Sequence, residues 1–127
     1  MSALETAATA ARQRAYAPYS GFRVGAALET EDGTIVTGCN VENASYSMTI
    51  CAERSAIATA VGLGHTRFRR LVISSDAAEP ISPCGACRQT LWEFAPDLEV
   101  VSVTDGARRS WALAELLPAG FSRSDLT

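Results

Sequence analysis

The sequence predicts one α/β domain, in which helices cover a mixed β-sheet. Three observations favour this fold class. Apolar residues recur at helical spacing near the N-terminus, two short β-branched runs flank Asp32-Gly33, and further on helix-forming segments alternate with apolar runs. A chain of 127 residues with 47% hydrophobic content can bury one sizeable core, so we expect a single domain over residues 1–127.

The first third of the chain predicts a helix followed by a hairpin. Residues 3–16 are rich in alanine with apolar side chains at helical spacing, and they stop before Pro18, so we expect a helix there. Residues 22–29 and 34–39 read as strands, and the Asp-Gly pair between them is a strong hairpin-turn signal. These two strands should pair antiparallel.

The rest of the chain alternates helices and strands. Helix formers that end beside Gly62 and Gly64, and a second such run closed by Pro96, mark two helices, while apolar runs mark strands. The expected elements are a helix at 51–63, a strand at 70–74, a helix at 84–95, strands at 98–104 and 108–113, and a helical turn at 115–117.

Charge and hydropathy argue against two classes of partner. The net charge is −3, and the eleven basic residues, all arginines, are spread along the chain, which is a poor electrostatic footprint for nucleic acid. No run approaches the ~20 apolar residues of a membrane helix, and residues 1–11 lack the pattern of a secretion signal. We therefore expect a cytoplasmic protein without nucleic-acid or membrane partners.

Three of the four cysteines are placed where a metal could be held. Cys51 begins one predicted helix, and Cys84 and Cys87 lie in the first turn of another. The positive ends of helices stabilise thiolates, the form that binds metal. Cys51, Cys84 and Cys87 are therefore natural ligands for one Zn²⁺ ion.

A structural zinc site has four protein ligands, whereas a catalytic site keeps three and leaves a position for water. His65 lies at the far end of the helix that Cys51 begins, about 20 Å away at ~1.5 Å per residue, and is a poor ligand candidate. Cys39 could complete a four-cysteine site, although a lone strand cysteine is more often a small buried residue. Glu53, two residues after Cys51, favours the catalytic alternative, because a structural zinc does not need it.

The segments Cys51-Ala52-Glu53 and Pro83-Cys84-Gly85-Ala86-Cys87 match the zinc deaminase signature, in which the glutamate carries protons and does not bind zinc. The chain further resembles the small, homotetrameric cytidine deaminases in segments 17–22, 38–46, 50–54, 82–89 and 115–118. The resemblance implies a three-layer α/β/α fold with a mixed five-stranded sheet. It also implies zinc-dependent deamination of free cytidine and deoxycytidine in pyrimidine salvage.

The resemblance also implies roles for the substrate-binding residues. Asn40 and Glu42 correspond to residues that hold the ribose hydroxyls, Phe22 to one that lies against the base, and Ala52 to one that offers its backbone to the base. By pattern alone, Phe22 would belong to the core and the polar pair to turn hydrogen bonds. Only the resemblance assigns Phe22, Asn40 and Glu42 to the substrate-binding site.

The remaining expectations concern charge, proton transfer and assembly. Glu53 would take a proton from water and pass it to N3 of the pyrimidine, and Arg54 would offset the negative charge of three thiolates. Phe121 stands in a Gly-, Ser- and Arg-rich tail, and its counterpart in the family reaches a neighbouring subunit's pocket. A homotetramer with sites completed by neighbouring subunits is therefore expected.

Four other functions remain open at this point. Cys84-Gly85-Ala86-Cys87 at a helix start is also typical of thioredoxin-like redox motifs, but Cys51 and Glu53 would then have no purpose. A structural zinc module would need a fourth ligand. A deaminase of polynucleotides is disfavoured by the acidic charge, whereas a deaminase of aminonucleoside antibiotics shares the same zinc motifs.

Overall fold

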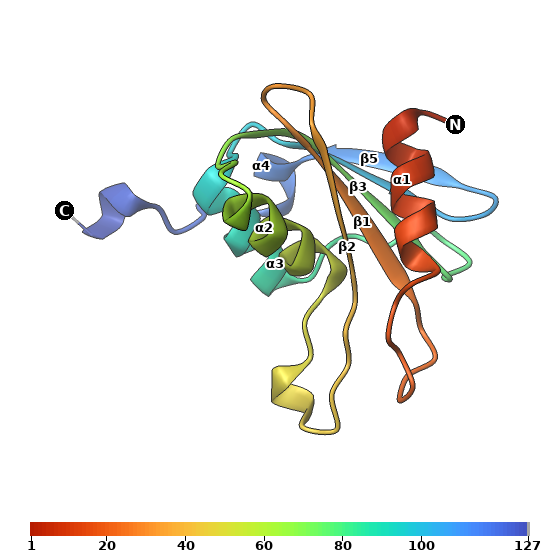
Figure 1. Ribbon diagram of the computed structural model, residues 1–127. Coiled ribbons are helices and arrows are strands. Elements are labelled where there is room, and N and C mark those ends of the chain that lie inside the picture. The colour runs from red at the N-terminus through yellow and green to blue at the C-terminus, as the bar shows by residue number, and fades with distance from the viewer. Residues whose placement is uncertain (127) are drawn as a thin grey trace.

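A computed structural model describes residues 1–126 of the chain, and a five-stranded sheet forms its centre (Figure 1). The strands are β1 (Val24–Thr30), β2 (Ile35–Cys39), β3 (Phe68–Ser75), β4 (Glu99–Val103) and β5 (Arg108–Ala112). They lie in the order β2-β1-β3-β4-β5. Only β3 and β4 pair in parallel, and the other neighbours are antiparallel, which confirms the mixed five-stranded sheet.

Helices cover both faces of this sheet. The helices are α1 (Ala3–Arg12), α2 (Ala52–Gly62), α3 (Gly85–Phe94) and α4 (Leu113–Leu116), with 3₁₀ turns η1 (Tyr46–Met48) and η2 (Arg123–Leu126). Helix α1 lies on one face and α2 and α3 lie on the other, so the three-layer α/β/α arrangement is confirmed (Figure 1). Among residues 1–126, no helix has both the length and the apolar character needed to cross a bilayer.

Two apolar cores result, one on each face. Along β3, Leu71 and Ile73 point into the core shared with α2 and α3, while Val72 between them points into the core under α1. Successive side chains of a strand face opposite sides, and both sides are covered here, so the middle of the strand, Leu71-Val72-Ile73, is apolar on both faces. This is why residues 70–74 read as a buried strand in the sequence.

Helix α1 ends earlier than the sequence predicts. It stops at Arg12, four residues before Tyr16, after a start that a capping box between Ser2 and Glu5 fixes. The Tyr16 N–H donates to the Asn40 carbonyl at 3.0 Å, and the Tyr16 carbonyl accepts from Glu42 N–H at 2.8 Å. Pairing with a segment distant in sequence holds Tyr16 extended, and this overrides the helical propensity of the alanine-rich run.

The close approach of α2 to the sheet depends on Gly38 of β2. A Cβ at Gly38 would lie 2.4 Å from the backbone nitrogen of Ala56 and 2.7 Å from the carbonyl oxygen of Ala52. No other residue type leaves this room. The approach fixes where the first turn of α2 lies, and with it Cys51 and Glu53.

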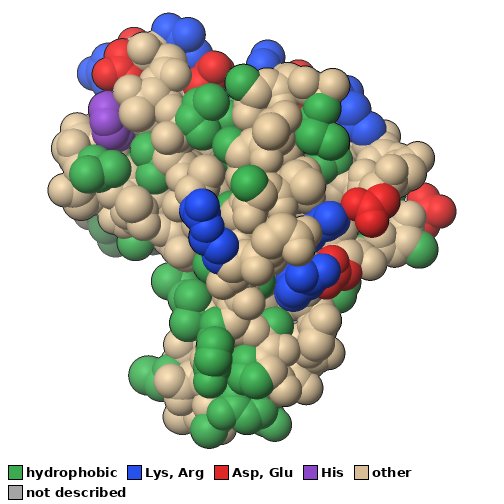
Figure 2. All heavy atoms as spheres, turned by 45° about the vertical axis from the view of Figure 1, so that its right-hand side comes forward, with side chains coloured by type: hydrophobic (Ala, Val, Ile, Leu, Met, Phe, Trp, Pro, Cys, Tyr) green, Lys and Arg blue, Asp and Glu red, His purple; other side chains and the backbone are tan. Residues whose placement is uncertain are grey.

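Beyond β2 the chain forms an arm, residues 42–49, that projects from the sheet (Figure 1). Its base is closed by two backbone hydrogen bonds of 3.0 Å between Val41 and Ile50. Apolar side chains gather on the lobe formed by the arm and the loop before β1 (Figure 2). The exposed apolar residues here are Tyr16, Tyr19, Phe22, Val41, Tyr46 and Met48.

Candidate active site

Two helix N-termini bring the three predicted cysteine ligands together. Cys51 is the N-cap residue of α2, Cys84 is the N-cap residue of α3, and Cys87 lies in the first turn of α3. Their three sulfur atoms lie within 4.8 Å of one another, and the Sγ atoms of Cys84 and Cys87 are 3.5 Å apart. The positive ends of two helices therefore face one cluster of thiols.

The cluster fits a tetrahedral zinc ion. Zinc–sulfur bonds of about 2.3 Å place tetrahedral thiolates about 3.8 Å apart, close to the separations seen here. All four cysteines are free, and a disulfide would need sulfurs about 2.05 Å apart. Within residues 1–126 no fourth His, Cys, Asp or Glu joins the cluster, so neither Cys39 nor His65 closes it. The donor set is that of a catalytic site with three protein ligands.

The surroundings of Cys51 favour its thiolate form. A hydrogen bond from Cys87 and the neighbouring Arg54 lower the pKa of Cys51 to about 5, against the opposing effect of burial. The same hydrogen bond, together with full burial, raises the pKa of the Cys87 thiol. Arg54 Nη2 donates to Cys51 Sγ at 3.7 Å, so the guanidinium lies against this sulfur.

Glu53 lies in the first turn of α2, two residues after Cys51, and is only 5% exposed. Burial raises its pKa and the charge of Cys51 adds to this effect, while hydrogen bonds from its own backbone and from Cys87 oppose it. The carboxyl group is therefore adjacent to the cysteines without belonging to their cluster. A buried carboxyl beside a metal site is suited to proton transfer.

Asn40 connects Phe22 to the start of β1. The Asn40 side chain donates from Nδ2 to the carbonyl of Phe22 and accepts at Oδ1 from the N–H of Val24, both at 2.9 Å. Asn40 is buried, whereas the Phe22 side chain is 37% exposed. Ala52 is fully buried, and its methyl side chain has no hydrogen-bonding group.

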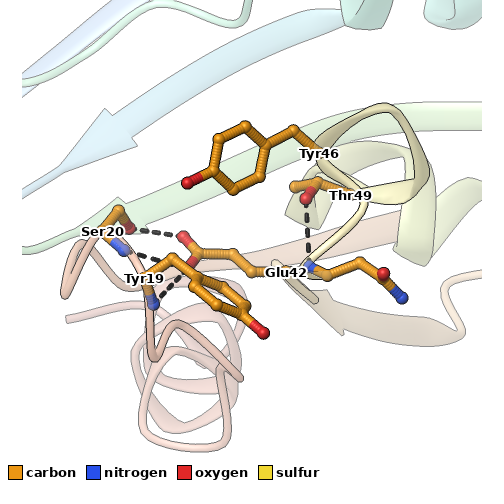
Figure 3. Close-up of a pocket in the computed structure, with 6 residues that line it drawn as sticks. Tyr19, Ser20, Glu42, Tyr46 and Thr49 are labelled. Atoms are coloured by element: carbon orange, nitrogen blue, oxygen red, sulfur yellow. Dashed lines mark hydrogen bonds between the residues drawn. The ribbon is translucent and has the colours of Figure 1, made fainter.

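Glu42 lies at the base of the arm, beside the loop that precedes Phe22 (Figure 3). Its Oε1 accepts 3.0 Å hydrogen bonds from the N–H groups of Tyr19 and Ser20, and its Oε2 accepts one from the Ser20 hydroxyl. These bonds hold the pKa of Glu42 below its ordinary value. The carboxylate borders a pocket of about 400 Å³ lined by Tyr19, Ser20, Glu42, Asn43, Tyr46 and Thr49.

Phe121 follows α4 on the C-terminal segment, which leads away from the sheet, and is 55% exposed (Figure 1). The side-chain amide of Gln89 on α3 bonds to both backbone groups of Phe121. Neither Gln89 nor Ser20 was predicted from the sequence to take part in the site. A serine two residues before Phe22 is a local turn signal, but the sequence offers no sign of a contact across 32 residues.

Comparisons with known proteins agree with this arrangement. The family described as "cytidine and deoxycytidylate deaminase zinc-binding region" matches residues 2–103. A cytidine deaminase of Sporosarcina psychrophila is 50% identical over 119 residues, which cover 92% of this chain and 88% of that protein. The crystal structure of a cytidine deaminase from Burkholderia pseudomallei is 48% identical, with a TM-score of 0.91 over 95% of this chain and 100% of that chain.

A relative that is named for a different substrate is also similar. The blasticidin-S deaminase of Bacillus cereus is 33% identical over 109 residues, which cover 80% of this chain and 78% of that protein.

Proposed function

This chain belongs to the zinc-binding cytidine and deoxycytidylate deaminase family, and we propose that it hydrolyses free cytidine and deoxycytidine to uridine and deoxyuridine. The reaction consumes one water and releases one ammonia, and it serves pyrimidine salvage. The observation that carries this proposal is the three-cysteine cluster with the buried Glu53 carboxyl beside it.

Cys51, Cys84 and Cys87 would hold the zinc ion. When bound, zinc supplies Lewis acidity that makes water nucleophilic near neutral pH. Three thiolates and a divalent cation sum to a net charge of −1. Arg54, which donates to Cys51, and the two helix N-termini offset part of this charge.

Glu53 would move protons between water and the base. Its position two residues after Cys51 places it next to the metal ligands, and its burial keeps bulk water from competing for the proton. It accepts a proton from the attacking water, delivers it to N3 of the pyrimidine, and then assists the departure of ammonia from C4.

Phe22, Asn40, Glu42 and the Ala52 backbone would orient the nucleoside. A carboxylate has about four lone-pair positions, and Glu42 uses three of them in the structure, which leaves one for a ribose hydroxyl. Asn40 uses one of its two N–H groups and one lone pair, so it keeps a donor and an acceptor. Phe22 presents a partly exposed ring to the base.

A second copy of this chain would cover the apolar lobe of Figure 2. Tyr46 and Met48 on the arm are 76% and 65% exposed, and Phe121 stands on a segment that leads away from its own sheet. We propose a homotetramer in which Phe121 completes a neighbouring subunit's site. A cytoplasmic location suits three thiols that must stay reduced to bind metal.

The decisive experiment is an ultraviolet assay of cytidine and deoxycytidine, with the zinc content measured on the same sample. We expect turnover with about one zinc per chain. Glu53→Gln should lose a factor of about 10² to 10⁴ in kcat while keeping its zinc, because the side chain carries protons and does not bind metal. Glu79→Gln, in an exposed loop, is the matched control.

Near-normal turnover of Glu53→Gln would refute the proposed mechanism. Zinc without turnover on either nucleoside, together with activity on blasticidin S, would instead assign the chain to the antibiotic deaminases.

A further inference from the structure

We propose that Ser20 is a positioning residue of the nucleoside site, whose hydroxyl ties the Glu42 carboxylate to the Phe22 backbone. The inference rests on the proposed function, because it takes Glu42 as the residue that holds the ribose and Phe22 as the residue beside the base. It adds a residue that fixes the positions of Glu42 and Phe22 relative to each other.

The Ser20 hydroxyl makes one directional bond on each side. It donates to Glu42 Oε2, and it accepts from the N–H of Phe22 at 3.0 Å. A hydroxyl has a single proton to donate, so its orientation is determined by these two partners. The ribose-side carboxylate and the base-side residue are therefore linked through one side chain, as Figure 3 shows for Ser20 and Glu42.

The backbone around Ser20 is shaped for the same carboxylate. The consecutive N–H groups of Tyr19 and Ser20 both point at Glu42 Oε1, an arrangement that binds anions. The loop turns back at Gly21, where φ is +69° and the N–H donates to the Ala17 carbonyl at 2.9 Å. Glycine adopts this left-handed conformation without strain, so the turn that aims both N–H groups is built into the local sequence.

Without the hydroxyl, only Oε1 of Glu42 would remain fixed. The two backbone bonds converge on that one oxygen, so the carboxylate could rotate and carry Oε2 away from its present place. The Ser20 bonds lie at an exposed site, where a hydrogen bond to an ion contributes little to folding. Their loss should therefore appear in substrate binding rather than in stability.

The test compares two substrates that differ only in the 2′- and 3′-hydroxyls of the ribose, which Glu42 and Asn40 are proposed to hold. Ser20→Ala should lower kcat/KM for cytidine about tenfold, mostly through KM, because a hydrogen bond to a charged group is lost. With 2′,3′-dideoxycytidine the loss should be less than about twofold, because no hydroxyl remains for Glu42 to hold. Ser20→Thr, which keeps the hydroxyl, should restore most of the activity, and Ser110→Ala on edge strand β5 is the matched control.

Two outcomes separate failure of this inference from failure of the proposed function. If Glu42→Gln does not distinguish cytidine from dideoxycytidine, the proposed role of Glu42 is wrong, and this inference falls with it. If Glu42→Gln does distinguish them while Ser20→Ala matches the wild type, or loses equally on both substrates, only the inference about Ser20 is overturned. If Glu42→Gln and Ser20→Ala each distinguish the two substrates, the variant that carries both substitutions should lose no more kcat/KM on cytidine than Glu42→Gln alone.

Discussion

Gln89 holds the backbone of Phe121 through two hydrogen bonds that run in opposite directions. Gln89 Nε2 donates to the Phe121 carbonyl at 2.7 Å, and Gln89 Oε1 accepts from the Phe121 N–H at 3.2 Å. One turn further along α3, Trp92 Nε1 donates to Ser122 Oγ at 3.0 Å. Helix α3, which begins after Cys84, therefore also fixes the C-terminal segment.

Gln89→Ala should release Phe121 without removing its ring. We expect a loss in kcat/KM on cytidine of about tenfold, because two hydrogen bonds that hold the segment are lost. The double variant with Phe121→Ala should be no worse than Phe121→Ala alone, since both changes act on the same contact. Gln13→Ala, an exposed glutamine after α1, is the control. Additive losses would show that Gln89 acts elsewhere.

Zinc content distinguishes three ligands from four. Cys51→Ala should lose most of its zinc, because the cluster depends on all three thiols. Cys39→Ala should keep about one zinc per chain, because Cys39 lies on β2 outside the cluster. Elemental analysis after gel filtration measures both variants. Loss of zinc from Cys39→Ala would instead indicate a closed site with Cys39 as a fourth ligand.

Glycines at two positions should respond to alanine in opposite ways. Gly38→Ala should destabilise the protein by about 1–3 kcal/mol or more and reduce turnover, because the new methyl group pushes α2 from the sheet. At Gly62, within α2, a Cβ meets no atom within 4 Å. Because Gly62 is the last residue of α2, Gly62→Ala should stabilise the protein by less than the ~0.5–1 kcal/mol that applies in the middle of a helix. Urea unfolding measures both, and equal effects would contradict the packing argument.

Acid should weaken the fold partly through Asp76. Hydrogen bonds from Arg23 hold the pKa of this carboxyl below its ordinary value of 3.8. The unfolded chain therefore binds the proton more readily, so the stabilisation is complete above about pH 4 and is lost as the pH falls through the folded-state pKa. Between pH 6 and pH 3, the free energy of unfolding measured in urea should fall less in Asp76→Asn than in the wild type.

The free energies of unfolding of the wild type and of Asp76→Asn are plotted against pH and compared at equal zinc content, because protonation of the thiols also releases metal in acid. Parallel curves for the two proteins would show that Asp76 does not contribute.

Much of the metal site could be predicted from local sequence. Cys51 and Cys84 read as helix starts because helix formers follow each of them, and the structure places both at N-caps. Strand β3 could be predicted because covered faces require apolar residues on both sides. Each of these inferences depends on residues within one helix turn or one strand.

The early end of α1 was not predictable in the same way. Residues 13–16 have helix-forming neighbours, yet Tyr16 is extended because its backbone pairs with Asn40 and Glu42. The partners are more than twenty residues away in sequence. Local propensity contributes only fractions of a kcal/mol per residue, so two backbone hydrogen bonds to a distant segment can override it.

The sequence by itself determined the type of site, because the spacing of Cys51, Glu53, Cys84 and Cys87 matches the zinc deaminase signature. Tertiary structure alone decided that three thiols meet within 4.8 Å, that Ser20 bonds to Glu42, and that Gln89 bonds to Phe121. These contacts depend on the path of the chain between distant residues. That path is set by the packing of helices on the sheet, which no short stretch of sequence contains.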